Sequence, residues 1–308
     1  MRKVSLIVGL GVLALTVSAR AQEGAPPAAE APVAGEAAGA PPAVAPEAAP
    51  APASVVAAND DEYALRPLTL GAGVFQVTVP VVLNLSKSAV LKPVWIPLDL
   101  RYGVSDQLEV FVSHNDHATP LAFGGGGVCL GGKDRGCFKS NGDSAFYNNL
   151  NVGAQFSFLK NAGVELSGIG ALEIREISPD VLAAINVGVG IKYVAAPISI
   201  KAEPQIGIGV NKRDVGNKEI ISVPVQFAYQ ASPVLAIYLD TGIFGATDQF
   251  SKHYVVPAGI GANFLVQHGL DVGAEFMLPQ AIAGSDLPSD DKGANIRTLM
   301  IYAAWRNL

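Results

Sequence analysis

An alternation of apolar and polar residues, repeated about a dozen times, constrains the fold of this chain more than any other feature. In its clearest instance, residues 181–193, every odd position is apolar or aromatic. From position 186 onward the even positions are Asn186, Gly188, Gly190 and Lys192. A period of two is typical of a β-strand with one apolar and one polar face.

The composition favours a membrane protein that crosses with strands. Half of the 308 residues are hydrophobic and only 16% are charged. Beyond the N-terminus, however, no run reaches the roughly 18 apolar residues of a spanning helix. Closed barrels are the other structures that satisfy every backbone polar group in lipid. The net charge of −6, without a basic stripe, argues against a nucleic-acid partner.

The first 58 residues are predicted to precede the folded domain. Residues 1–21 are typical of a signal peptide: Arg2 and Lys3, then an apolar run over 4–17, then Ala19-Arg20-Ala21 as a cleavage site. Residues 22–58 consist almost entirely of Ala, Pro, Gly, Val and Glu and cannot bury a core. We expect a disordered periplasmic spacer there, acting as a passive tether or contacting the cell wall.

Twelve strands are expected after the spacer, and their connections alternate in length. They lie at approximately 69–85, 94–104, 108–113, 148–158, 164–174, 181–193, 198–210, 221–229, 235–243, 254–266, 270–278 and 296–305. Connections after the second, fourth, sixth, eighth and tenth strands are tight, whereas most others are longer and polar. Short periplasmic turns and longer outer loops are typical of membrane barrels. We therefore expect an all-β, 12-stranded antiparallel transmembrane β-barrel over 65–308, with both termini in the periplasm.

Two further observations bear on the barrel prediction. Outward aromatics gather beside the tight turns, where an interfacial girdle would lie. They are Tyr102, Phe158, Tyr193, Tyr229 and Phe264.

Against the prediction, four prolines fall inside expected strands, and we expect them to mark bulges. They are Pro97, Pro204, Pro224 and Pro257. A soluble β-sandwich is the alternative, but it needs neither a dozen strands nor aromatic strand ends.

Residues 102–110 (YGVSDQLEV) and 268–273 (HGLDVG) resemble the turn-and-strand repeats of outer-membrane β-barrel proteins of Gram-negative bacteria, in particular small transporter-like barrels. The resemblance covers roughly residues 65–308. It implies an outer-membrane location, contact with lipid and insertion by the barrel-assembly machinery. The C-terminus departs from the pattern, because Trp305 is followed by Arg306-Asn307-Leu308 rather than ending the chain.

The polar parity of each strand predicts which charges face the lumen. Eight acids and four bases are assigned to it. They are Asp99, Arg101, Glu109, Glu165, Glu173, Arg175, Lys192, Lys201, Glu203, Asp240, Asp271 and Glu275. Either these groups pair and fill the lumen, or they line a narrow water-filled path that favours cations. The expected function is thus a channel for passive diffusion of small polar solutes or ions. The alternative is a structural or surface-binding barrel with a filled lumen.

A long loop at 115–145 contains the only two cysteines, Cys129 and Cys137, and their spacing in a secreted chain predicts a disulfide. An enzymatic barrel, a lipase or protease, is disfavoured. Ser140-Asn141-Gly142 is present, but Phe138 stands where a barrel phospholipase needs a histidine base. We expect no catalytic residue, cofactor or metal site.

Overall fold

The computed structural model describes residues 62–86, 91, 93–114, 126–130, 138–140, 143–145, 147–161, 163–177, 180–286 and 292–308. The predicted signal peptide and spacer, Cys137 and most of the 115–145 loop lie outside the described residues. Within the described part, no helix is long and apolar enough to cross a membrane.

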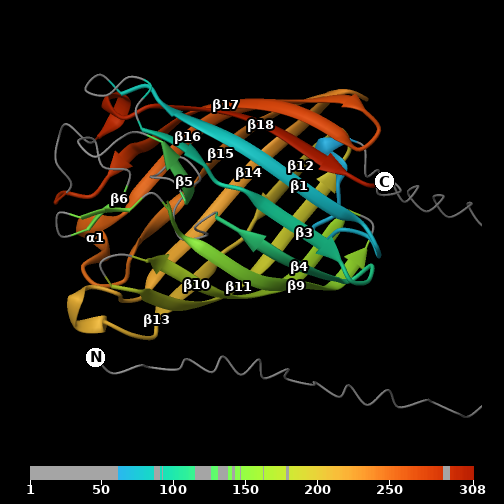
Figure 1. Cartoon of the computed structure of the whole chain (residues 1–308). Helices are drawn as coiled ribbons and strands as arrows, with labels where there is room; N and C mark the ends of the chain where they lie inside the picture. The colour runs from blue at the N-terminus through green and yellow to red at the C-terminus, as the bar shows by residue number, and fades with distance from the viewer. Residues whose placement is uncertain are drawn as a thin grey trace, which may run out of the picture. The chain divides into compact units, whose positions relative to one another are not determined.

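Sixteen strands form one antiparallel sheet that closes on itself as a barrel of twelve staves (Figure 1). The staves are β1 (Phe75–Asn84), β3 (Asp99–Gly103), β4 (Leu108–Ser113), β9 (Leu150–Asn161), β10 (Val164–Glu176), β11 (Leu182–Ala195), β12 (Ile198–Ala202) with β13 (Gln205–Gly209), β14 (Ile220–Ser232), β15 (Leu235–Ala246), β16 (Val255–Gln267), β17 (Leu270–Ala283) and β18 (Thr298–Arg306). The first and last staves pair in register from Gln76 and Arg306 to Asn84 and Thr298. The predicted fold class, a 12-stranded antiparallel barrel, is confirmed.

The barrel is polar inside and apolar outside, the reverse of a soluble sheet. In β11, Asn186 and Lys192 are 1% and 5% exposed, whereas Val187 and Ile191 are 51% and 41% exposed. The aromatics beside the tight turns, from Tyr102 to Phe264, are 44–56% exposed and face outward. An outer surface of this kind suits lipid, which solvates apolar side chains and excludes unpaired charges.

The prolines interrupt the wall in different ways. Pro97 separates β3 from the short strand β2 (Val94–Ile96), and Pro204 separates β12 from β13. At Pro257 the pairing of β16 with β17 shifts register, as the expected bulge requires. Pro224 instead lies opposite Gly242 within the continuous pairing of β14 with β15, so no bulge forms there. Each proline lacks a backbone donor, and all but Pro224 occupy a break or an irregularity.

At the long-loop end, short strands extend the wall. The next described strand after β4 is β5 (Gly127–Leu130), which pairs with β2 and with β8 (Tyr147–Asn148). A separate hairpin joins β6 (Phe138–Ser140) to β7 (Asp143–Ala145). Four short helical turns complete the described elements: η1 (Tyr63–Leu65), η3 (Arg213–Val215), α1 (Phe250–His253) and η5 (Gly293–Asn295).

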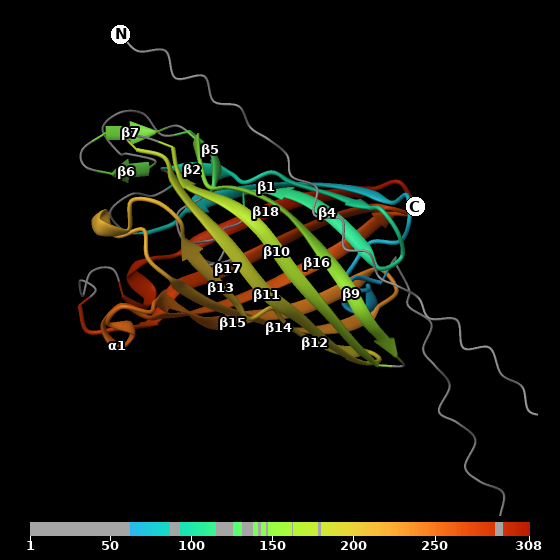
Figure 2. The same cartoon turned by 90° about the horizontal axis from the view of Figure 1, so that it is seen from below.

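The chain before β1 differs from the sequence prediction. Residues 69–74 were expected in the first strand, but β1 begins at Phe75. Residues 62–74, hereafter the N-terminal plug segment, lie within the short-turn end of the barrel and bury Ala64, Leu65, Leu68 and Thr69 (Figure 2). Gly71 and Gly73 explain the change. Gly73 has a φ of +79°, and a Cβ at Gly103 would lie 2.0 Å from the Gly71 carbonyl oxygen. The chain therefore turns inward before the ladder starts.

Candidate functional site

A cavity of about 330 Å³ lies inside the barrel, a size typical of small-ligand pockets. Its wall comes from strands on all sides and, at the short-turn end, from the N-terminal plug segment. Ten charged side chains line it, five acidic and five basic. They are Asp99, Glu109, Glu203, Asp240 and Glu275 with Arg66, Arg101, Lys192, Lys201 and Arg306.

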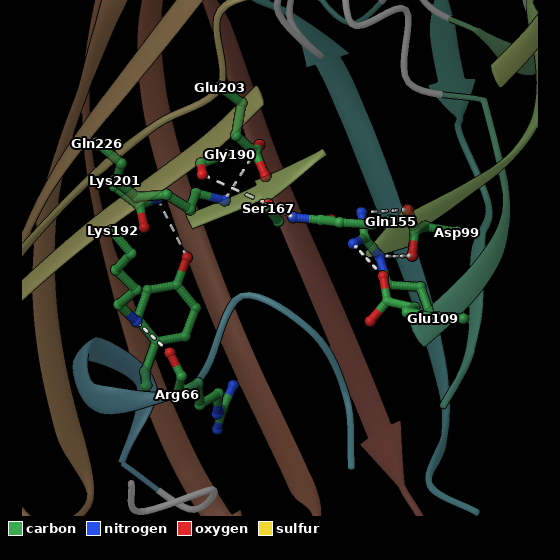
Figure 3. A network of polar contacts seen from close by, with 12 residues as sticks. Arg66, Asp99, Glu109, Gln155, Ser167, Gly190, Lys192, Lys201, Glu203 and Gln226 are labelled. Atoms are coloured by element: carbon green, nitrogen blue, oxygen red, sulfur yellow. Dashed lines mark hydrogen bonds and ion pairs between the residues drawn. The ribbon is translucent and has the colours of Figure 1, made fainter. Parts of the chain in front are cut away.

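On one side of the cavity, Arg101 is held between two carboxylates. Its Nε and Nη2 donate to Asp99 at 2.9 and 3.2 Å, and its Nη1 donates to Glu109 at 2.9 Å. Asp99 and Arg101 share a face because they are two residues apart on β3, and Glu109 follows on the paired strand β4. Both acids are buried, so the guanidinium offsets two charges that have little contact with water. Figure 3 shows Asp99 and Glu109 together.

Across the lumen, two lysines lie directly opposite each other on neighbouring strands. Lys192 of β11 pairs in register with Lys201 of β12. Lys201 Nζ lies 3.6 Å from Glu203, while Lys192 Nζ donates to the backbone carbonyl of Arg66 in the N-terminal plug segment (Figure 3). The two ammonium groups thus have separate acceptors, which reduces their mutual repulsion.

The third side of the cavity carries two tyrosines packed over glycines. A Cβ at Gly261 would lie 2.3 Å from the Tyr238 ring, and one at Gly273 would lie 2.2 Å from the Tyr302 ring. Asn263 Nδ2 donates to the Tyr302 hydroxyl at 3.0 Å. These inward glycines therefore provide room for aromatic rings rather than for an empty path.

The N-terminal plug segment is attached to the wall through its own backbone N–H groups. Side-chain oxygens of Gln230, Glu165, Glu109 and Asp106 accept these bonds. The donors are Ala64 at 3.0 Å, Leu68 at 2.7 Å, Leu70 at 2.9 Å and Ala72 at 3.0 Å, respectively. The acceptors belong to β14, β10, β4 and the β3–β4 turn. Side-chain oxygens, two of them from the buried carboxylates Glu109 and Glu165, thus replace the partners that a strand would find in a ladder.

Side chains of the N-terminal plug segment add further contacts. Arg66 Nη2 donates to Asp271 at 2.8 Å, and Arg306 reaches the other oxygen of the same carboxylate at 3.3 Å. The Tyr63 ring stacks on Tyr238 with centroids 5.4 Å apart. Gln226 Nε2 donates to the Tyr63 hydroxyl at 3.2 Å. The segment is therefore held on β14, β15 and β17 as well as by the backbone acceptors.

Of the twelve charges assigned to the lumen from sequence, eight line this cavity. Glu165 and Asp271 are buried beside it and bind the N-terminal plug segment. Glu173 and Arg175 lie elsewhere. Arg175 Nε donates to Glu173 at 3.0 Å, and its Nη1 donates to Asn217 and to the Lys218 carbonyl at 3.1 and 2.7 Å. This pair ties β10 to the 210–219 loop.

Sequence reasoning missed two of the cavity's bases. Arg306 follows the outward Trp305 and shares the parity of buried Tyr302, so parity alone could have found it. Arg66 lies outside any strand, and no periodicity could have placed it. Eight of the predicted charges line the cavity, five acids and three bases. With Arg66 and Arg306 added, five acids and five bases line it, so its wall is balanced rather than acidic.

Within the described ranges, no three His, Cys, Asp or Glu side chains are arranged to hold a metal ion. Cys129 is buried with Val82, Trp95, Met300 and Tyr302 at the loop end of the lumen. Its expected pairing with Cys137 stays a prediction, because Cys137 lies outside the described residues.

No family model and no curated protein sequence matches the chain. Among solved structures, the NanC porin superposes with a TM-score of 0.52 at 6% sequence identity, over 74% of this chain and 98% of that one. The KdgM porin and an outer membrane channel from Pseudomonas putida give TM-scores of 0.47 and 0.45 at 8% and 13% identity, over 75% and 78% of this chain and 98% and 97% of theirs. The fold is that of a small porin-like barrel, as the sequence predicted.

Proposed function

We propose that the protein is an outer-membrane channel for passive diffusion of small polar solutes or ions. The observation that carries this proposal is the 330 Å³ cavity with its ten charged side chains, enclosed by a barrel whose outer face is apolar. A lumen of fixed charges can replace part of the hydration of a small polar solute. The porin-like fold supports the same function.

The location follows from the same features. The apolar outer face suits membrane lipid, and the closed barrel suits the outer membrane of a Gram-negative bacterium. In our proposal a signal peptide directs the chain to the periplasm and the assembly machinery inserts the barrel. Residues 22–58 then form a periplasmic spacer that reaches toward the cell wall, and Cys129 and Cys137 form a disulfide in the outer loop. We propose no enzymatic activity.

The balanced charge of the cavity sets the expected selectivity. Five acids and five bases line it, and two more buried acids, Glu165 and Asp271, lie beside it, so the surplus of acids is small and neither sign of ion has a large advantage. We therefore propose weak charge selectivity, instead of the cation path that eight acids and four bases in the sequence suggested.

The test is single-channel conductance of the refolded barrel in a planar bilayer under a salt gradient. We expect small current steps with a reversal potential near zero. A large reversal potential of either sign would contradict the balanced-lumen proposal. Absence of steps from a heat-modifiable barrel, both in the parent and after the N-terminal plug segment has been displaced, would contradict the channel itself.

A structural or surface-binding barrel is the second candidate, and the N-terminal plug segment favours it. Four hydrogen bonds from its backbone N–H groups to wall side chains, and an arginine–carboxylate contact, hold this segment inside the barrel. If the segment never leaves, the lumen stays filled, and the long loops are then the surface that binds other molecules. Conductance that stays silent after the segment has been displaced would favour this second function.

A further inference from the structure

We propose that residues 62–74 form a gate that closes the short-turn mouth of the barrel and must move for solute to pass. This inference rests on the proposed channel function. The N-terminal plug segment controls access to the lumen. The strands of the barrel wall keep the same positions in the closed and the open state.

The N-terminal plug segment runs across the short-turn mouth of the barrel. It begins at Tyr63 and Ala64, which contact Gln226, Gln230 and Tyr238 on β14 and β15. It ends at Gly73, whose N–H donates to the carbonyl of Gly103 at the end of β3 at 2.8 Å. In the closed strand order β3 and β14 lie on opposite sides of the barrel. The segment therefore spans the full width of the opening.

The segment also contacts the wall on both flanks of this crossing. On one flank Glu165 of β10 accepts from Leu68, and Lys192 of β11 donates to the Arg66 carbonyl. On the other flank Arg66 reaches Asp271 of β17. A segment held at both ends and on both flanks leaves little of the mouth uncovered. Seven of its residues also line the cavity above it, so its departure would open that cavity to the periplasmic side.

The N-terminal plug segment is attached to the wall differently from the way the staves are attached to one another. The twelve staves are joined by continuous ladders of backbone hydrogen bonds. The N-terminal plug segment meets the wall chiefly through bonds that involve side chains. Its backbone–backbone bonds to the wall are confined to the hinge, where Gly73 donates to Gly103 and Val74 accepts from Gly103. Its release would break no pairing between staves. The N-terminal plug segment can therefore leave the mouth while the pairing of the strands stays intact, which a gate requires.

The test uses the full chain with substitutions confined to the segment. The release variant carries Leu65→Ala, Arg66→Ala and Leu68→Ala, which removes two buried side chains and the Asp271 contact. The matched control carries Arg213→Ala, Leu172→Ala and Leu239→Ala, the same side-chain losses at exposed positions. A locked variant carries Ala64→Cys and Ala228→Cys, two positions of one buried cluster, in a Cys129→Ser/Cys137→Ser background.

Two readouts separate the gate from the channel. A Thr69→Cys probe in the same background reports release by its labelling rate with a water-soluble thiol reagent, since Thr69 is buried. Planar-bilayer recording reports conduction. We expect the release substitutions to raise both labelling and open fraction roughly tenfold, because charged and apolar contacts are lost together. The control should match the parent, and the locked variant should conduct only after reduction.

Each outcome is decisive. Equal conduction by parent, release and locked proteins would overturn the gate while leaving the channel standing. Fast labelling of the release variant without conduction would overturn the channel, and the gate with it. Unchanged labelling together with unchanged conduction would show that the segment is a fixed part of the lumen.

Discussion

Two arginine–carboxylate groups in this barrel are built alike and do different things. Arg101 and Arg175 each lie two residues from a buried acid on the same strand face, Asp99 and Glu173, and each bonds to it. Arg101 also donates to Glu109, which in turn accepts from the Leu70 N–H of the N-terminal plug segment. Arg175 instead adds Asn217 and the Lys218 carbonyl. Position along the strand, rather than the local motif, decides whether such a group serves the lumen or a loop.

The largest effect is expected from Arg101→Met. This change leaves the buried carboxylates of Asp99 and Glu109 without their guanidinium. Removing one partner of a buried ion pair costs about 3–5 kcal/mol. Urea unfolding of the refolded barrel, followed by the loss of its heat-modifiable band, measures the change. Stability equal to that of the parent would show that water reaches these acids.

Arg175→Met should cost less, because it leaves one buried carboxylate, Glu173, without its guanidinium where Arg101→Met leaves two, and it should act elsewhere. It removes one ion pair and two loop contacts, and hydrogen bonds to charged groups contribute about 1.5–3 kcal/mol. Hydrogen exchange should rise over 210–219 and stay unchanged over the plug. Arg101→Met should show the opposite pattern. If the two variants loosen the same region, the proposed difference between the groups is wrong.

Lys201→Glu tests the balance of the cavity rather than its stability. The change turns five acids and five bases into six acids and four bases. We expect the reversal potential under a salt gradient to shift toward cations, because the fixed charge of the wall becomes negative. Lys212→Glu, at an exposed loop position, is the matched control and should shift it less.

The smallest effect concerns the loop that Arg175 supports. The Arg213 guanidinium lowers the pKa of Glu219, and Lys218 lowers the pKa of Asp248. Since both folded-state pKa values are depressed, these contacts contribute above the ordinary carboxylate pKa and are lost as pH falls through the folded-state values. The protection of amides 210–219 from hydrogen exchange, corrected for the intrinsic exchange rate at each pH, should therefore decrease on acidification below about pH 4. Arg213→Ala should remove part of this pH dependence.

The wall was predictable from sequence because a β-strand has a period of two that each segment displays by itself. Parity placed Asp99, Arg101 and Glu109 on the inner face before any contact was known. The plug was not predictable in this way. Residues 62–74 have no periodicity, and their acceptors, from Glu109 to Gln230, belong to strands far apart in the sequence. The role of an inward glycine is likewise not readable from sequence, since only the structure shows that Tyr238 and Tyr302 occupy the space beside Gly261 and Gly273.

The pairing of β1 with β18 has a consequence for the connectivity of the chain. A closed sheet has no first or last strand, and the break between the chain ends is only a gap in covalent linkage. Here Asn307 bonds to Phe75 and Gly73, so the gap lies beside the hinge of the plug. A circularly permuted gene opened at an outer loop, with the old ends joined and residues 62–74 omitted, should encode the same twelve staves.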